Sequence, residues 1–222
     1  MKKIVLMIFM ILMFVILQSQ ISFFGGATAS WIPDNNFSSN VENMFENIFE
    51  NIINLNVSTE VAFNIHLGVS YVNYDNDTSQ ILIKPGIMYI SRGWKSTGHI
   101  NQVSFESKHK VSFLDLFVKF KLNQGFGKSD IKTNPRLFYP YVGVAYSTLI
   151  NSQTILDDGT SVNETDFVFN KDFSLLIGFD ILLNRRFIVG AGYTHGLVRV
   201  FDETYMPNEY NRSVNVSLGL HF

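Results

Sequence analysis

Residues 213–222 read Ser-Val-Asn-Val-Ser-Leu-Gly-Leu-His-Phe and alternate between two kinds of side chain at every step. One face carries Val214, Val216, Leu218, Leu220 and Phe222, whereas the other carries serine, asparagine, glycine and histidine. Because successive side chains of a strand point to opposite sides, this stretch predicts a β-strand with one wholly apolar face. An apolar face opposite small polar residues is typical of a barrel strand that lies in lipid.

Seven other segments show the same alternation at the length that a tilted membrane strand needs, about 9 to 11 residues. Together with the last segment they make an even number, which lets the sheet close without an unpaired edge. The sequence therefore predicts an all-β fold, an eight-stranded antiparallel up-and-down transmembrane β-barrel. Its strands are expected at residues 21–32, 61–74, 81–94, 111–122, 139–150, 172–183, 187–201 and 213–222.

The connections between these segments also follow a pattern. If the first strand starts in the periplasm, every second connection faces outward and is long, and the others are short turns. The long outward set is residues 33–59, 95–110, 151–171 and 202–211, and two inward turns are residues 75–80 and 184–186. The third inward connection, residues 123–138, is longer than expected and contains turn-forming glycine, asparagine and proline.

The start of the sequence predicts export. Lys2 and Lys3 precede an uninterrupted apolar run of 14 residues at positions 4–17. A basic start followed by such a run predicts a signal peptide, here residues 1–20, because an anchor helix would need about 20 apolar residues. Residues 21–222 are then expected to form one barrel domain in the outer membrane of a Gram-negative-type bacterium.

Composition and motifs exclude several classes of function. The chain has no cysteine, and its formal charge of -2 argues against a nucleic-acid partner held by phosphate contacts. No Gly-x-Ser-x-Gly or His-Glu-x-x-His motif occurs, and the histidines lack a short metal-binding spacing. Residues 123–129 imitate the end of a phosphate loop, but Leu122 stands where its first glycine would fall. We therefore predict no catalytic, cofactor or metal site.

One outward connection carries a helical pattern. Residues 39–55 place apolar side chains at helical spacing, with Glu-Asn pairs on the remaining face. This predicts a short amphipathic helix in the first outward loop. It would either pack across the barrel mouth or dock a partner, and its polar face lacks the lysines and arginines of helices that bind lipid surfaces.

Inward-facing charges are the remaining feature of the predicted strands. The candidates for a charge network in the lumen are Lys84, Asp115, Lys119 and Asp180. Ionised groups in a narrow lumen need partners, so these residues predict salt bridges that fill the barrel. The alternative is a selectivity or proton path.

Several strand motifs resemble one known family. They are Lys84-Pro85-Gly86, Ser91-Arg92-Gly93-Trp94, Phe113-Leu114-Asp115-Leu116, Tyr139-Pro140-Tyr141-Val142-Gly143, Tyr193-Thr194-His195-Gly196-Leu197 and residues 211–222. In these motifs the chain resembles the PorT-like outer-membrane β-barrel proteins, and the resemblance covers nearly all of residues 21–222. It implies an eight-stranded outer-membrane barrel, in a family whose members mostly lack an assigned activity and include some associated with protein secretion. Departures are Lys84, where many relatives have a neutral polar residue, and the enlarged first loop.

The main functional hypothesis is a non-enzymatic envelope protein with a structural or accessory role, acting through its extracellular loops. One alternative is an accessory component of a protein-secretion system. Another is a secreted, soluble, lipocalin-like barrel that turns its apolar faces inward around a ligand. A third, an outer-membrane acyltransferase or protease, would need a catalytic group that the sequence does not provide. Expected partners are outer-membrane lipid, a protein at the loops, and the barrel-assembly machinery, for which Phe222 resembles an assembly signal.

Overall fold

The computed structural model describes residues 21–31, 55–72, 81–100, 103–122, 137–163, 170–183, 186–199 and 210–222. The predicted signal peptide and all of the predicted loop helix except Leu55 lie outside these residues, and Leu55 begins a strand. In the described part of the chain, no helix is long and apolar enough to cross a membrane. The strands are β1 (Ile21–Trp31), β2 (Leu55–Tyr71), β3 (Ile81–Ile100), β4 (Val103–Leu122), β5 (Leu137–Leu156), β6 (Ser161–Asn163), β7 (Lys171–Leu183), β8 (Phe187–Arg199) and β9 (Tyr210–His221).

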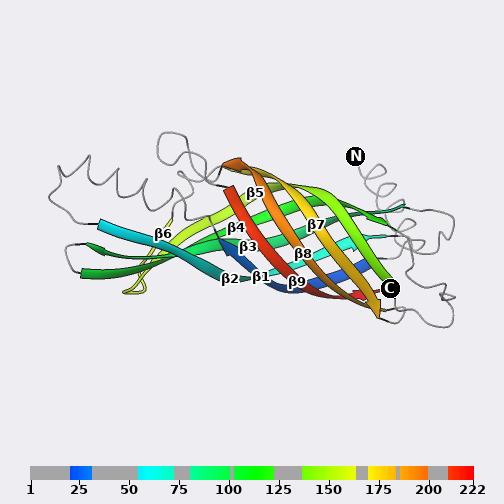
Figure 1. Cartoon of the computed structure of the whole chain (residues 1–222), viewed down its shortest axis with the longest axis horizontal. Helices are drawn as coiled ribbons and strands as arrows, with labels where there is room; N and C mark the ends of the chain where they lie inside the picture. The colour runs from blue at the N-terminus through cyan, green and yellow to red at the C-terminus, as the bar shows by residue number, and fades with distance from the viewer. Residues whose placement is uncertain are drawn as a thin grey trace, which may run out of the picture.

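The strands form a closed antiparallel ring (Figure 1). Each ring strand pairs with its neighbours along the chain, and β1 pairs with β9 from Ser22 opposite His221 to Trp31 opposite Arg212. The short β6 pairs with the outer part of β5 and stays outside the ring, so eight of the nine strands close the barrel. This confirms the predicted eight-stranded up-and-down barrel.

Burial alternates along the strands as the sequence pattern predicts. On β7, Phe173, Leu175 and Ile177 point outward and are exposed, whereas Asp172 and Ser174 point inward and are buried. The other ring strands also carry exposed large apolar side chains on the outside, from Phe23 on β1 to Leu220 on β9. A polar interior and an apolar exterior contradict the lipocalin-like alternative, which needed the apolar faces inside.

Aromatic side chains mark both edges of the apolar exterior. At the end of the barrel where β1 begins and β9 ends, the Phe23 ring lies 6.0 Å from that of Phe222. Near the opposite end, the Trp31 ring lies 6.4 Å from that of Tyr193. Aromatic girdles at the two membrane interfaces are typical of transmembrane barrels.

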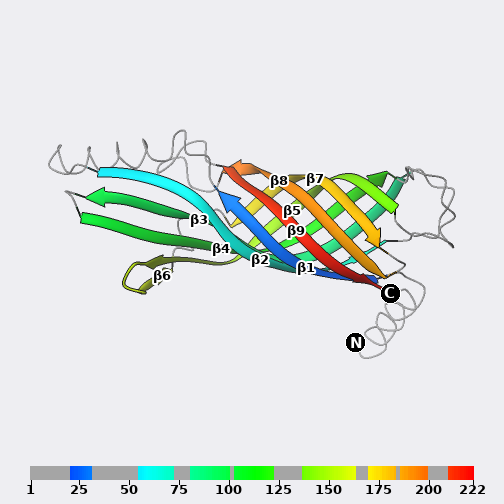
Figure 2. The same cartoon turned by 60° about the horizontal axis from the view of Figure 1, so that its bottom comes forward.

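Four ring strands extend well beyond the other four at one end (Figures 1 and 2). We call this part the sheet extension; it consists of residues 55–61 of β2, 94–100 of β3, 103–110 of β4, 149–156 of β5, and β6. The prediction of loops at 95–110 and 151–171 was therefore wrong for most of these residues. The extension carries polar side chains on much of both faces, so it shows no clear two-residue hydrophobic period. Backbone pairing along β3 and β4, which continues to Ile100 opposite Val103, maintains these strands.

A bulge interrupts the pairing of β2 with β3. Residues 62–65 pair with β1 but not with β3, between Val61 opposite Trp94 and His66 opposite Ile90. The Ser30 side chain fills this gap, because Gly93 N–H donates to Ser30 Oγ at 2.8 Å and Ser30 Oγ donates to Gly93 C=O at 2.9 Å. Buried backbone groups that the bulge leaves unpaired are thus satisfied.

The outward face of β7 gives a test of depth in the bilayer. Replacing Ile177 by Arg should lower the free energy of unfolding by roughly 2 to 4 kcal/mol, because the charge would sit near the midplane. Leu183→Arg, on the same face but at the strand end, should cost about 0 to 1 kcal/mol. Denaturant titrations of the barrel refolded in vesicles measure both, and equal costs at the two positions would contradict the assigned membrane depth.

Candidate functional site

The lumen contains two clusters of buried charges, one toward each end of the barrel. The first lies toward the end where β1 begins and joins Lys84 of β3, Lys121 of β4 and Asp180 of β7. Lys84 Nζ lies 3.0 Å and Lys121 Nζ 2.5 Å from the same Asp180 Oδ2 atom. All three side chains are buried, so one carboxylate oxygen bridges two ammonium groups across the lumen.

Lys119 belongs to this cluster through aromatic rings. Its Nζ lies 4.2 Å from the ring centroid of Tyr141 and 5.3 Å from that of Phe117. The aromatic faces therefore contact a cation that we expected to be held by a salt bridge. Lys119 is the cross-strand neighbour of Lys84, so three lysines gather near one carboxylate and the formal charge of this cluster is positive.

Glycines make room for the Tyr141 side chain. A Cβ atom at Gly178 would lie 2.7 Å from Tyr141 Oη, and one at Gly192 would lie 2.3 Å from it. These two residues of β7 and β8 thus allow a large ring to cross the lumen. The aromatic contact of Lys119 depends on that space.

The second cluster centres on Arg92 of β3. Its NH2 atom lies 2.7 Å from Asp115 Oδ2, and its NH1 atom lies 3.0 Å from Asp172 Oδ2. Ser174 Oγ donates a further hydrogen bond to Asp172 at 3.1 Å, and the guanidinium lies 5.2 Å from the Phe113 ring centroid. Arg92 and Asp115 are essentially inaccessible to solvent, at 1% and 0% exposure. One cation therefore faces two carboxylates, and the formal charge of this cluster is negative.

The structure thus distributes the four predicted network residues over both clusters. Lys84, Lys119 and Asp180 lie in the first and Asp115 in the second. Arg92, Lys121 and Asp172 complete the contacts but were not among the predicted network residues. The alternation along each strand could have identified them. Arg92 lies on the same inward face of β3 as Lys84, and Asp172 lies on the same inward face of β7 as Ser174.

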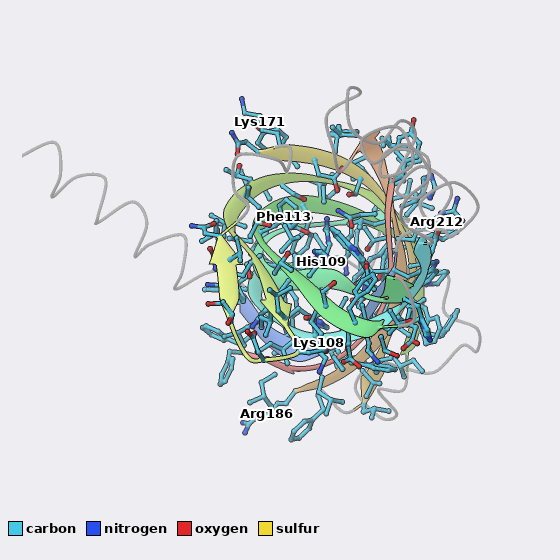
Figure 3. All side chains as sticks on the ribbon, turned by 90° about the vertical axis from the view of Figure 1, so that its left-hand side faces the viewer. Lys108, His109, Phe113, Lys171, Arg186 and Arg212 are labelled. Atoms are coloured by element: carbon cyan, nitrogen blue, oxygen red, sulfur yellow. The ribbon has the colours of Figure 1, made fainter. Side chains whose placement is uncertain are left out.

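Histidines of the lumen pair with hydroxyl groups. His221 Nδ1 lies 2.8 Å from Ser22 Oγ, and His66 Nδ1 lies 2.9 Å from Thr28 Oγ1. At the mouth of the barrel, His109 stacks on Trp94 with ring centroids 4.7 Å apart, and Figure 3 shows His109 and Phe113 inside the ring of strands. Among the described residues, no group of three or more acidic or histidine side chains could hold a metal ion.

The shared contact at Asp180 predicts an unequal effect of two charge removals. Asp180→Asn should lower the free energy of unfolding by about 3 to 5 kcal/mol, because two buried lysines lose the carboxylate that both contact. Asp172→Asn should cost less, because Arg92 keeps its salt bridge to Asp115. Denaturation in vesicles compares them, and a larger loss for Asp172→Asn would contradict the central position of Asp180.

Some proteins of known structure are similar to this chain. No curated protein matches the sequence. The fold is similar to that of the attachment invasion locus protein of Yersinia pestis (9% identity, 92% of this chain and 99% of that chain, TM-score 0.45). It is also similar to Neisserial surface protein A (10% identity, 91% and 97%, TM-score 0.48) and to OprG from Pseudomonas aeruginosa (10% identity, 92% and 96%, TM-score 0.47).

The family assignment comes from the sequence. Residues 16–202 match the family described as outer membrane protein beta-barrel domain. This match spans most of the chain and agrees with the closed ring, the apolar exterior and the aromatic edges. The chain therefore belongs to the outer membrane protein beta-barrel domain family.

Proposed function

We propose that this chain is a non-enzymatic envelope protein that presents an extracellular β-sheet to protein partners. The observation that carries the proposal is the sheet extension. Pairing of β1 with β2 stops at Ser30 opposite Ala62, so no described strand pairs with the outer edge of residues 55–61. The free edge of a strand offers backbone donors and acceptors to an added strand.

The filled lumen favours an accessory role over transport. Arg92, Lys121, Phe113 and Phe117 occupy the interior and are all at most 3% exposed. Eight strands enclose a space that side chains can fill, whereas aqueous channels occur in barrels of about 16 strands or more. The salt bridges at Asp180 and Arg92 are therefore best interpreted as a plug.

The hydroxyl groups that lie beside imidazoles support a non-enzymatic role. The hydroxyl groups of Ser22, Thr28, Ser107 and Thr154 each contact a histidine, which is the contact that an activated nucleophile would need. All four residues are buried, with at most 7% exposure, so a substrate has little access to their oxygens. An acyltransferase or protease would need an accessible nucleophile.

A second candidate is an accessory role in protein secretion. It rests on the strand motifs shared with PorT-like proteins, such as Tyr139-Pro140-Tyr141 and Ser91-Arg92-Gly93-Trp94, which support a closer relationship to that family. Under this proposal the sheet extension would contact a component of the secretion system.

The proposal requires the extension to be outside the cell. Because the chain has no cysteine, single cysteines are unique labels. Val162→Cys in β6 should react with a membrane-impermeant maleimide on intact cells, whereas Arg186→Cys in the turn before β8 should react only after lysis; both positions are exposed. The reverse pattern would overturn the proposed orientation.

The same cysteine tests the contact surface. A crosslinker attached to Val162→Cys should join the protein to one discrete partner, and the lipid-facing Leu175→Cys serves as the control. Equal crosslinking at both positions, or none at Val162→Cys in cells that express the protein normally, would contradict the proposal.

A conductance measurement separates the accessory role from transport. The purified barrel should show no porin-sized current in planar bilayers, because its lumen is filled with paired side chains. Steady porin-sized conductance would make transport the leading function.

A further inference from the structure

A groove on the outer surface of the barrel lies beside the β2 bulge. It encloses about 570 Å³ between β2, β3, β4 and the end of β5. Residues 62–65 of β2 do not pair with β3, so the two strands separate at this level. The groove is thus a consequence of the same bulge that Ser30 bridges on the inner side.

The groove lies at the boundary between the apolar exterior of the barrel and the sheet extension. One wall is formed by Val61, Phe63 and Ile65, and Phe63 and Ile65 are 82% and 67% exposed. Beyond Tyr89, the outward positions of β3 are Ser91, Gly93 and Lys95. Beyond Leu114, those of β4 are Ser112, Lys110 and Lys108. One part of the groove therefore faces acyl chains and the other faces headgroups.

Three lysines line the headgroup side: Lys95 of β3 and Lys108 and Lys110 of β4. Lys95 Nζ lies 3.0 Å from Glu106 and 3.4 Å from Glu60, and Lys108 Nζ lies 3.5 Å from Glu106. The hydrogen bond from Lys95 lowers the pKa of Glu106 below its ordinary value, so this carboxylate remains charged.

The charges of the groove do not cancel. The two glutamates contact Lys95 and Lys108 but do not line the groove, and no ion pair in the described part of the chain includes Lys110. The three lysines exceed these two carboxylates by one charge. An excess of positive charge beside exposed phenylalanine and isoleucine suits a molecule with an anionic head and an acyl tail.

We infer that this groove binds a phosphate-bearing lipid of the outer leaflet, with its phosphate at Lys95, Lys108 and Lys110 and an acyl chain along Phe63 and Ile65. This site is independent of the proposed contacts of the sheet edge. A lipid is favoured over free phosphate because one wall of the groove is apolar and lies at the level of the membrane. Figure 3 shows Lys108 on β4, seen from the end of the barrel that carries the sheet extension.

The test uses the purified barrel in phosphatidylcholine nanodiscs and native mass spectrometry. The probe is diphosphoryl lipid A, and the comparison is its dephosphorylated form with the same acyl chains. The wild-type protein should retain the phosphorylated form preferentially, and millimolar inorganic phosphate should not displace it. Equal retention of both forms would overturn the phosphate contact, and displacement by inorganic phosphate would assign the site to the free anion.

Matched variants locate the site. Lys110→Gln should weaken retention roughly fivefold, because one lysine near a membrane surface strengthens binding to an anionic lipid by a factor of about five. Lys110→Arg keeps the charge and should preserve retention. Lys171→Gln removes an exposed lysine of β7 outside the groove and should have no effect.

Phe63→Gln should weaken retention of both lipid forms. Equal losses for Lys110→Gln and Lys171→Gln would overturn the site, and heat-modifiable migration in gels verifies that each variant is folded.

Discussion

Closure of the backbone hydrogen bonds is the constraint on which the rest of this structure depends. Lipid offers no partner to a free N–H or C=O group, so every strand edge within the membrane must be paired. The pairing of β1 with β9 meets this requirement, and Phe222 N–H donates to Ile21 C=O at 2.9 Å where the ring closes. At the β2 bulge, the backbone hydrogen bonds between β2 and β3 are interrupted, and the Ser30 side chain replaces the missing backbone partner of Gly93.

Closure also determines where charge and function can be located. Because the exterior of the membrane part is apolar, polar side chains of the ring strands point into a narrow lumen and must find partners there. The resulting clusters at Asp180 and Arg92 have formal charges of opposite sign and fill the interior. A filled interior leaves the outside of the barrel and the sheet extension as the surfaces available to other molecules.

The two-residue period predicted much of this fold because membrane strands have strongly different faces. Ile177 and Ser174 were assigned to the correct sides, and most strand ends inside the membrane fell within a few residues. The two-residue period did not predict the strands of the sheet extension. Residues 95–110 carry polar groups on both faces, so their strands depend on pairing partners that no local pattern reveals. The predicted helix at 39–55 lies outside the described residues except for Leu55, which is in β2.

The sequence by itself determined which side chains face inward, because alternation along a strand is a local property. It therefore identified Lys84, Asp115, Lys119 and Asp180 as candidates for the lumen. Only the tertiary structure decided which of them meet. Lys84 and Asp180 are 96 residues apart and come from β3 and β7, while Asp115 contacts Arg92 and Lys119 lies against Tyr141. These contacts depend on the register of every intervening strand pair and on the bulges, and register is a relation between strands that the pattern within one strand does not contain.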